Sequence, residues 1–181
     1  MIEVHMPRPR KNGERYPSGE LRPRKDLGTP EVIAKRLALV GPGNSDRPPD
    51  PALAHYPLGV AFARGIVTSE QHQAGLDYAL AFAVAIGRPA MGAGRALARF
   101  MADDRGAMDD ADRERLTTDW RAYGDALLAH SRAVKDTLEN VVVYERLPAW
   151  LLPGHVEAPS DVTHRERLID GLRIIERIKR P

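Results

Sequence analysis

The sequence predicts an all-α protein of five or six helices that follow an irregular N-terminal arm. Paired helix start and stop signals recur after residue 28, and no stretch alternates apolar and polar residues as a half-buried strand does. Ten of the fifteen prolines precede residue 58, and residues 1–28 have no helical or strand period. We therefore expect an arm over residues 1–28 and a single helical domain over residues 29–181.

The first helix is predicted between Thr29 and Gly41. Thr29 is a favourable N-cap, Pro30 suits the first helical position, and Gly41 suits the end of a helix. Residues 41–51 are rich in glycine and proline and are expected to form a loop.

A helical hairpin is predicted over residues 57–86. Pro57 opens its first helix, which Gly65 ends in the left-handed conformation. Thr68 and Gln71 have the spacing of a capping box, which predicts a second helix from Ser69 to about residue 86.

A long helix is expected from about residue 110 to 140, because apolar residues recur there at spacings of three and four. A seam of this length packs either on the 69–86 helix or on a second copy of the chain. His130 lies on the seam and is expected to be a hydrogen-bonded core residue. The candidates for an oligomer contact are Leu116, Trp120, Leu127 and Val134.

Four further segments complete the prediction. A short helix is expected around residues 95–101, and residues 141–144 are interpreted as the end of the long helix or a short strand. Residues 149–152, between two prolines, are expected to form an apolar turn that fills the core. Thr163 and Glu166 form a second capping-box pattern, which predicts the start of the terminal helix.

Composition excludes several classes of protein. The absence of cysteine excludes disulfides, Cys-ligated zinc and thiol catalysis. No stretch approaches the ~18 consecutive apolar residues of a membrane span, and residues 1–11 lack the apolar run of a signal peptide. We expect a cytoplasmic protein without a membrane partner.

No catalytic constellation is evident, so we expect a protein that is not an enzyme and uses no metal or cofactor. His155-Val-Glu157 matches a fragment of the zinc deaminase motif, but that site also requires cysteine ligands.

Positive charge is concentrated at the two ends of the chain. Residues 1–28 and 164–181 each carry a net charge of +3, whereas residues 29–163 carry −4. Basic ends suit arms that contact phosphate, and the alternative is a solvated tail without a partner. The phosphate-contact candidates are Arg8, Arg10, Lys11, Arg22, Arg24 and Lys25.

The 57–86 hairpin fits the helix-turn-helix pattern in part. Three features agree: Ala61 four residues before Gly65, Ile66 after it, and Ala74 on the second helix. Arg64 and Gln71 occupy positions that are normally apolar. A plain helical hairpin is the alternative. If the motif is present, the residues that read base edges in the major groove of double-stranded DNA are Ser69, Glu70, His72 and Gln73.

Three segments carry a resemblance to a known group of proteins: Lys11-Asn-Gly-x-Arg-x-x-Ser-Gly-x-Leu21, then Leu58-Gly-x-x-x-x-x-Gly65-Ile-x-Thr-x-x-Gln-x-x-Ala-Gly75, and Val141-Val-Val-x-x-x-Leu-Pro148-x-Trp-Leu151. The chain resembles helical proteins of alphaproteobacterial prophages and gene-transfer-agent-like elements. This resemblance implies a phage setting, in which small helical proteins with basic arms are often transcription regulators or small terminase subunits.

We therefore expect a prophage-type DNA-binding protein, specifically a transcription regulator that also contacts RNA polymerase or a phage protein. The alternatives are a small terminase subunit or other packaging adaptor, which would oligomerise through the seam, and a protein-interaction adaptor that binds no DNA.

Overall fold

The structure is a computed structural model that describes residues 29–41, 50–86 and 109–179. These residues form six α-helices and two short 3-10 helices and contain no strand, which confirms the all-α prediction. The elements are α1 (Pro30–Val40), η1 (Pro51–His55), α2 (Pro57–Ala63), α3 (Ser69–Ile86), α5 (Asp110–His130), α6 (Arg132–Val142), η2 (Ala149–Leu151) and α7 (Pro159–Lys179). The predicted arm (1–28) and the short helix around 95–101 lie outside this part of the chain.

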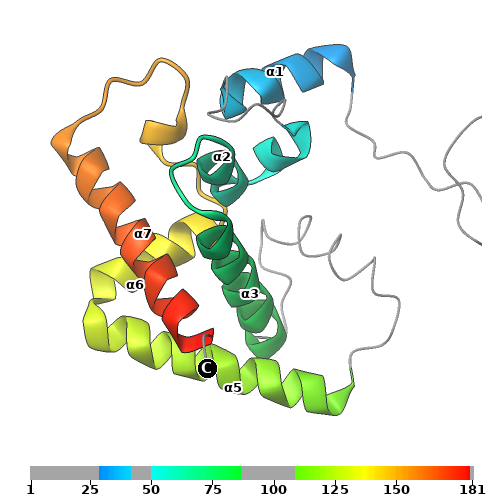
Figure 1. Cartoon of the computed structure of the whole chain (residues 1–181), viewed down its shortest axis with the longest axis vertical. Coiled ribbons are helices and arrows are strands. Elements are labelled where there is room, and N and C mark those ends of the chain that lie inside the picture. Colours follow the sequence, from blue (N-terminus) through cyan, green and yellow to red (C-terminus); the bar gives the residue numbers. More distant parts are fainter. Residues whose placement is uncertain (1–28, 42–49, 87–108, 180–181) are drawn as a thin grey trace, which may run out of the picture.

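Helix α3 is the central element of the fold. It packs against α5 and α7 and also contacts α2 and α6 (Figure 1). Its buried side includes Ala74, Gly75, Tyr78 and Ala79. The small residues allow neighbouring helices to approach closely, which suits a core with few aromatic side chains.

The core joins helices that are distant in the sequence. A Cβ atom on Gly75 would lie 2.5 Å from Cδ2 of Leu58 and 3.0 Å from Cδ2 of Leu172, so α2, α3 and α7 meet at this glycine. The largest side chains with no more than 2% exposure are Leu58, Tyr78, Leu127, Leu138, Leu151, Leu168, Leu172 and Ile175.

A polar contact ties α3 to α6 within this core. The hydroxyl of buried Tyr78 donates a hydrogen bond to Oε1 of Glu139 at 2.9 Å, and Nζ of Lys135 donates to the same oxygen at 2.6 Å. Burial and the neighbouring Glu139 carboxylate raise the pKa of Tyr78. The phenol therefore stays protonated and available as a donor.

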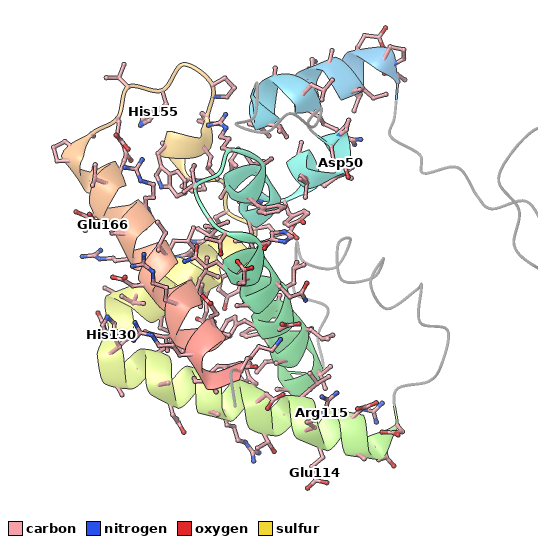
Figure 2. All side chains as sticks on the ribbon, in the orientation of Figure 1. Asp50, Glu114, Arg115, His130, His155 and Glu166 are labelled. Carbon is pink, nitrogen blue, oxygen red and sulfur yellow. The ribbon has the colours of Figure 1, made fainter. Side chains whose placement is uncertain are left out.

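The predicted long helix is divided in two at Ser131, which corrects the expectation of a continuous helix. Ser131 has extended backbone angles (φ −168°, ψ 131°) and is both the C-cap of α5 and the N-cap of α6. Its N–H donates to the carbonyl of Leu127 at 2.9 Å, and its carbonyl accepts from the backbone N–H of Lys135 at 3.2 Å. This break redirects the chain and places His130 on the exposed outside of α5 (Figure 2), so the core position expected for His130 is wrong.

The predicted start of the terminal helix is also wrong. α7 begins at Pro159, four residues before Thr163, whose hydroxyl donates to the Pro159 carbonyl inside the helix. The start is stabilised instead by Asp161, whose Oδ2 accepts from the N–H of Ala158 at 2.8 Å. The apolar turn before α7 is confirmed, because Trp150 and Leu151 of η2 are buried.

Candidate nucleic-acid interface

The predicted hairpin is present as α2, a short turn and α3. Gly65 has a positive φ of 68°, which favours glycine, and the N–H of Ile66 donates to the Ala61 carbonyl at 2.9 Å. The predicted capping box is confirmed in both directions. Oγ1 of Thr68 accepts from the N–H of Gln71 at 3.2 Å, and Oε1 of Gln71 accepts from the N–H of Thr68 at 3.0 Å.

Three of the four base-reading candidates are exposed at the start of α3: Ser69, Glu70 and Gln73. Their side chains are engaged with one another or with the next turn. The Ser69 hydroxyl donates to Glu70 at 3.0 Å, and the Gln73 amide donates to Asp77 at 3.0 Å. A base edge would have to replace these two exposed hydrogen bonds.

The fourth candidate, His72, faces its own chain. Its Nε2 lies 2.8 Å from the hydroxyl of Tyr56, and its ring stacks on Phe62 with 4.6 Å between centroids and 20° between planes. Burial lowers the pKa of His72 and raises the pKa of Tyr56 to about 12. Sequence reasoning missed Tyr56, because no helical period relates two residues 16 positions apart in different elements.

The two departures from the helix-turn-helix pattern have roles within this fold. Gln71 is buried, with 6% exposure, and forms half of the capping box. The guanidinium of Arg64 donates to the carbonyl of Leu39 through Nε at 3.0 Å and Nη2 at 2.6 Å, so it holds the C-terminus of α1 against α2. Gln71 thus closes the start of α3 and Arg64 ties the hairpin to α1, and both roles also suit a plain helical hairpin.

The start of α3 supplies no basic side chain, because residues 69–77 contain Glu70 and Asp77 but no Lys or Arg. Lys179 forms an ion pair with Asp77. The described residues contain fourteen Lys/Arg and eighteen Asp/Glu, a net charge of −4. Any strong attraction to phosphate must therefore come from other parts of the chain. The six phosphate-contact candidates, Arg8, Arg10, Lys11, Arg22, Arg24 and Lys25, lie outside the described residues.

The outward side of α7 has mixed charge. Glu166, Asp170, Arg173 and Arg177 follow one another at spacings of four, three and four residues, and Nη1 of Arg173 lies 3.6 Å from Oδ1 of Asp170. The acidic groups offset the basic ones, so the described part of this helix is not a uniformly basic surface.

The residues expected to form an oligomer seam pack inside one chain. Leu127 and Val134 are buried, while Leu116 and Trp120 are partly buried against the same core. Trp120 meets Phe82 of α3 edge-on, with 6.3 Å between ring centroids. The seam therefore packs within its own chain against α3, which is the first of its two expected arrangements.

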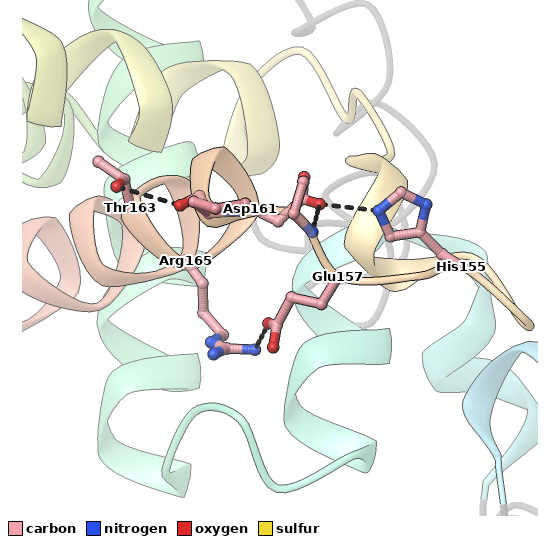
Figure 3. A network of polar contacts seen from close by, with 7 residues as sticks. His155, Glu157, Asp161, Thr163 and Arg165 are labelled. Carbon is pink, nitrogen blue, oxygen red and sulfur yellow. Dashed lines mark hydrogen bonds and ion pairs between the residues drawn. The ribbon is translucent and has the colours of Figure 1, made fainter.

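A second polar network surrounds the start of α7 (Figure 3). Nε2 of His155 lies 2.8 Å from Oδ2 of Asp161, and Arg165 forms an ion pair with Glu157. The hydrogen bond from His155 lowers the pKa of Asp161 and keeps its carboxylate ionised for capping. His155 and Glu157, the two residues that match a fragment of the deaminase motif, thus each pair with a side chain of α7.

No group of three or more potential metal ligands comes together within residues 29–41, 50–86 and 109–179. No helix in these ranges is long and apolar enough to cross a membrane. No protein-family model, curated protein or solved structure matches the chain.

Proposed function

We propose that this protein binds double-stranded DNA as a prophage-type transcription regulator, with the start of α3 facing the major groove. The observation that carries the proposal is the closed capping box between Thr68 and Gln71 after the Gly65 turn. It fixes the first turn of α3 while Ser69, Glu70 and Gln73 stay exposed. Hydroxyl, carboxylate and amide groups can all form hydrogen bonds with base edges.

Two groups of residues contribute differently to DNA binding in this proposal. Gln73 and its exposed neighbours supply sequence preference, whereas the basic residues between Arg8 and Lys25 supply affinity for any sequence. This division follows from the charge, because Glu70 repels phosphate and the described residues carry −4 in total.

The test is binding of the full chain to a randomised duplex library at low salt, followed by sequencing of the bound fraction. Gln73→Ala should change the selected sequences, whereas alanine at Arg8, Arg10 and Lys11 should weaken all duplexes alike and reduce the salt dependence. Ser69→Ala should also change the selected sequences, and Ser160→Ala, in the exposed first turn of α7, is its matched control. Absence of binding to every duplex would refute the proposal.

Mass measurement in solution separates a regulator from a small terminase subunit. A monomer or dimer agrees with regulation, and a ring of many copies favours packaging. The four seam residues supply no argument for a ring, because they pack within the chain.

A protein-interaction adaptor is the second candidate. It is favoured by apolar side chains exposed between α6 and α7, namely Leu147 at 39%, Leu152 at 45% and Val156 at 86%. Pull-down of RNA polymerase or a phage protein by a chain that binds no DNA would select this function. Loss of that capture in Val156→Ser would place the contact on this segment.

A further inference from the structure

We propose that the contact between His72 and Tyr56 is a proton-sensitive latch that holds α2 against the start of α3. The contact joins α2 and α3, which the turn at Gly65 links and which also pack together where Leu58 meets Gly75. Nε2 of His72 and the hydroxyl of Tyr56 are 2.8 Å apart, and the imidazole also stacks on Phe62. Both partners of His72 thus come from the segment 56–62.

The position of the phenol is fixed by the backbone of α2. Tyr56 is the N-cap of this helix and its ring lies on Gly59, where an added Cβ would be only 2.7 Å from Cζ of Tyr56. The ring therefore has little room to adjust if its partner changes. A change in the charge of His72 acts on the whole junction between α2 and α3.

Protonation changes both the charge and the hydrogen bonding of the latch. A neutral imidazole with an unprotonated Nε2 accepts from the Tyr56 hydroxyl, whereas an imidazolium can only donate, so the phenol would have to reverse its role. The new charge would be half-buried within the first turns of α3, close to the positive end of the helix dipole. The lowered pKa of His72 agrees with this preference for the neutral ring.

Other charged groups near the latch lie mainly around the phenol. Asp50, before η1, and Glu145, after α6, both act on Tyr56 and raise its pKa. On α3 itself, Glu70 precedes His72 and is exposed, while Arg64 of the turn is bound to the Leu39 carbonyl. Burial raises the pKa of Glu145, so its titration favours the folded state on acidification, opposite to that of His72.

The sign of the pH effect follows from linkage. A base whose pKa is lower in the folded state than in the unfolded state makes folding less favourable as the pH falls. As the pH falls, the loss of folding stability begins near 6.5, the ordinary pKa of histidine, and is complete below the folded pKa of His72. The latch is closed at neutral pH and opens on acidification, whether or not the protein binds DNA.

The test combines an NMR titration of the His72 ring with amide hydrogen exchange over residues 69–75 in the full chain. We expect His72 to titrate below 6.5, and exchange corrected for intrinsic rates to rise between pH 7.5 and 5. Each unit by which the folded pKa of His72 lies below its unfolded value corresponds to about a tenfold rise in the exchange rate. His72→Gln should abolish this rise, and His130→Gln, at an exposed histidine, should preserve it.

Two further variants keep the test decisive. Tyr56→Phe removes the hydrogen bond from neutral His72 and should raise the pKa of His72, which can be measured even if His72→Gln does not fold. Glu145→Gln removes the opposing titration and should enlarge the pH effect. The proposal is wrong if His72 titrates at or above 6.5, if Tyr56→Phe leaves its pKa unchanged, or if exchange in His72→Gln follows that of the original chain.

Discussion

At the scale of single residues, the start of α3 depends on Thr68. Its Oγ1 satisfies the N–H of Gln71, a donor without an intrahelical partner in the first turn. Thr68→Ala should lower the free energy of unfolding by about 1 kcal/mol, measured by urea denaturation. Ser69→Ala is the control, because the Ser69 hydroxyl donates only to exposed Glu70. Equal losses in the two variants would contradict a specific role for the capping box.

Glu145 offers a substitution that should increase stability. It lies three residues after α6 and has a φ of 48°, in the left-handed region where glycine is favoured. The N–H of Arg146 donates to the carbonyl of Asn140 at 2.8 Å, so the left-handed Glu145 lies inside the hydrogen-bonded turn that follows α6. Glu145→Gly should raise the free energy of unfolding by about 1 kcal/mol in thermal or urea denaturation. Glu145→Ala keeps the backbone strain and should give a smaller gain; a loss in Glu145→Gly would overturn the argument.

At the scale of elements, the packing of α3 depends on the absence of a side chain at Gly75. A methyl group there would meet Leu58 of α2 and Leu172 of α7 within 3.0 Å, so Gly75→Ala should destabilise the protein by about 1–3 kcal/mol. Gly124 in the middle of α5 is the matched control, because a Cβ there would have no neighbour within 4 Å. Gly124→Ala should stabilise by about 0.5–1 kcal/mol. The comparison is made by urea denaturation, and the same sign of change in both variants would be inconsistent with the described packing.

The elements also show which structural features the sequence could predict. α1 and α3 were predicted well because their ends carry local signals, such as Thr29, Gly41 and Thr68. The break at Ser131 was missed because Leu127, Val134 and Leu138 maintain helical spacing across it. Serine is favoured at N-caps, so Ser131 is a local signal for the break, but the apolar spacing across it favours a continuous helix.

The candidate site was predicted less completely than the fold. Exposure of Ser69, Glu70 and Gln73 agrees with their place in the first turn of α3, which a capping box defines. The inward direction of His72 depends on Tyr56 and Phe62 from another helix. Contacts of this kind depend on tertiary packing, which a single sequence does not encode in any local pattern.

At the scale of the whole molecule, we expect the segment 1–28 to contribute to binding more than to folding. Ordering a residue costs about 1–2 kcal/mol, whereas each of the four aliphatic side chains Ile2, Val4, Leu21 and Leu27 can contribute roughly 1.5–3 kcal/mol on burial. Deletion of residues 1–28 should leave the melting temperature nearly unchanged and should weaken binding to DNA of any sequence. A large fall in melting temperature would show that this segment is part of the folded core.

The position of α3 between α5 and α7 has a consequence for the order of events during synthesis. The ion pair between Asp77 and Lys179 spans 102 residues, and Gly75 meets Leu172 across a similar separation. At ~5–20 residues per second, a ribosome needs on the order of ten seconds to translate this interval. Throughout that time α7, which covers this side of α3 in the described part of the structure, has not been made, although α2 and the turn at Gly65 have. The nascent protein therefore passes through a stage in which its central helix is available to chaperones, and α7 ends that stage when it packs on α3.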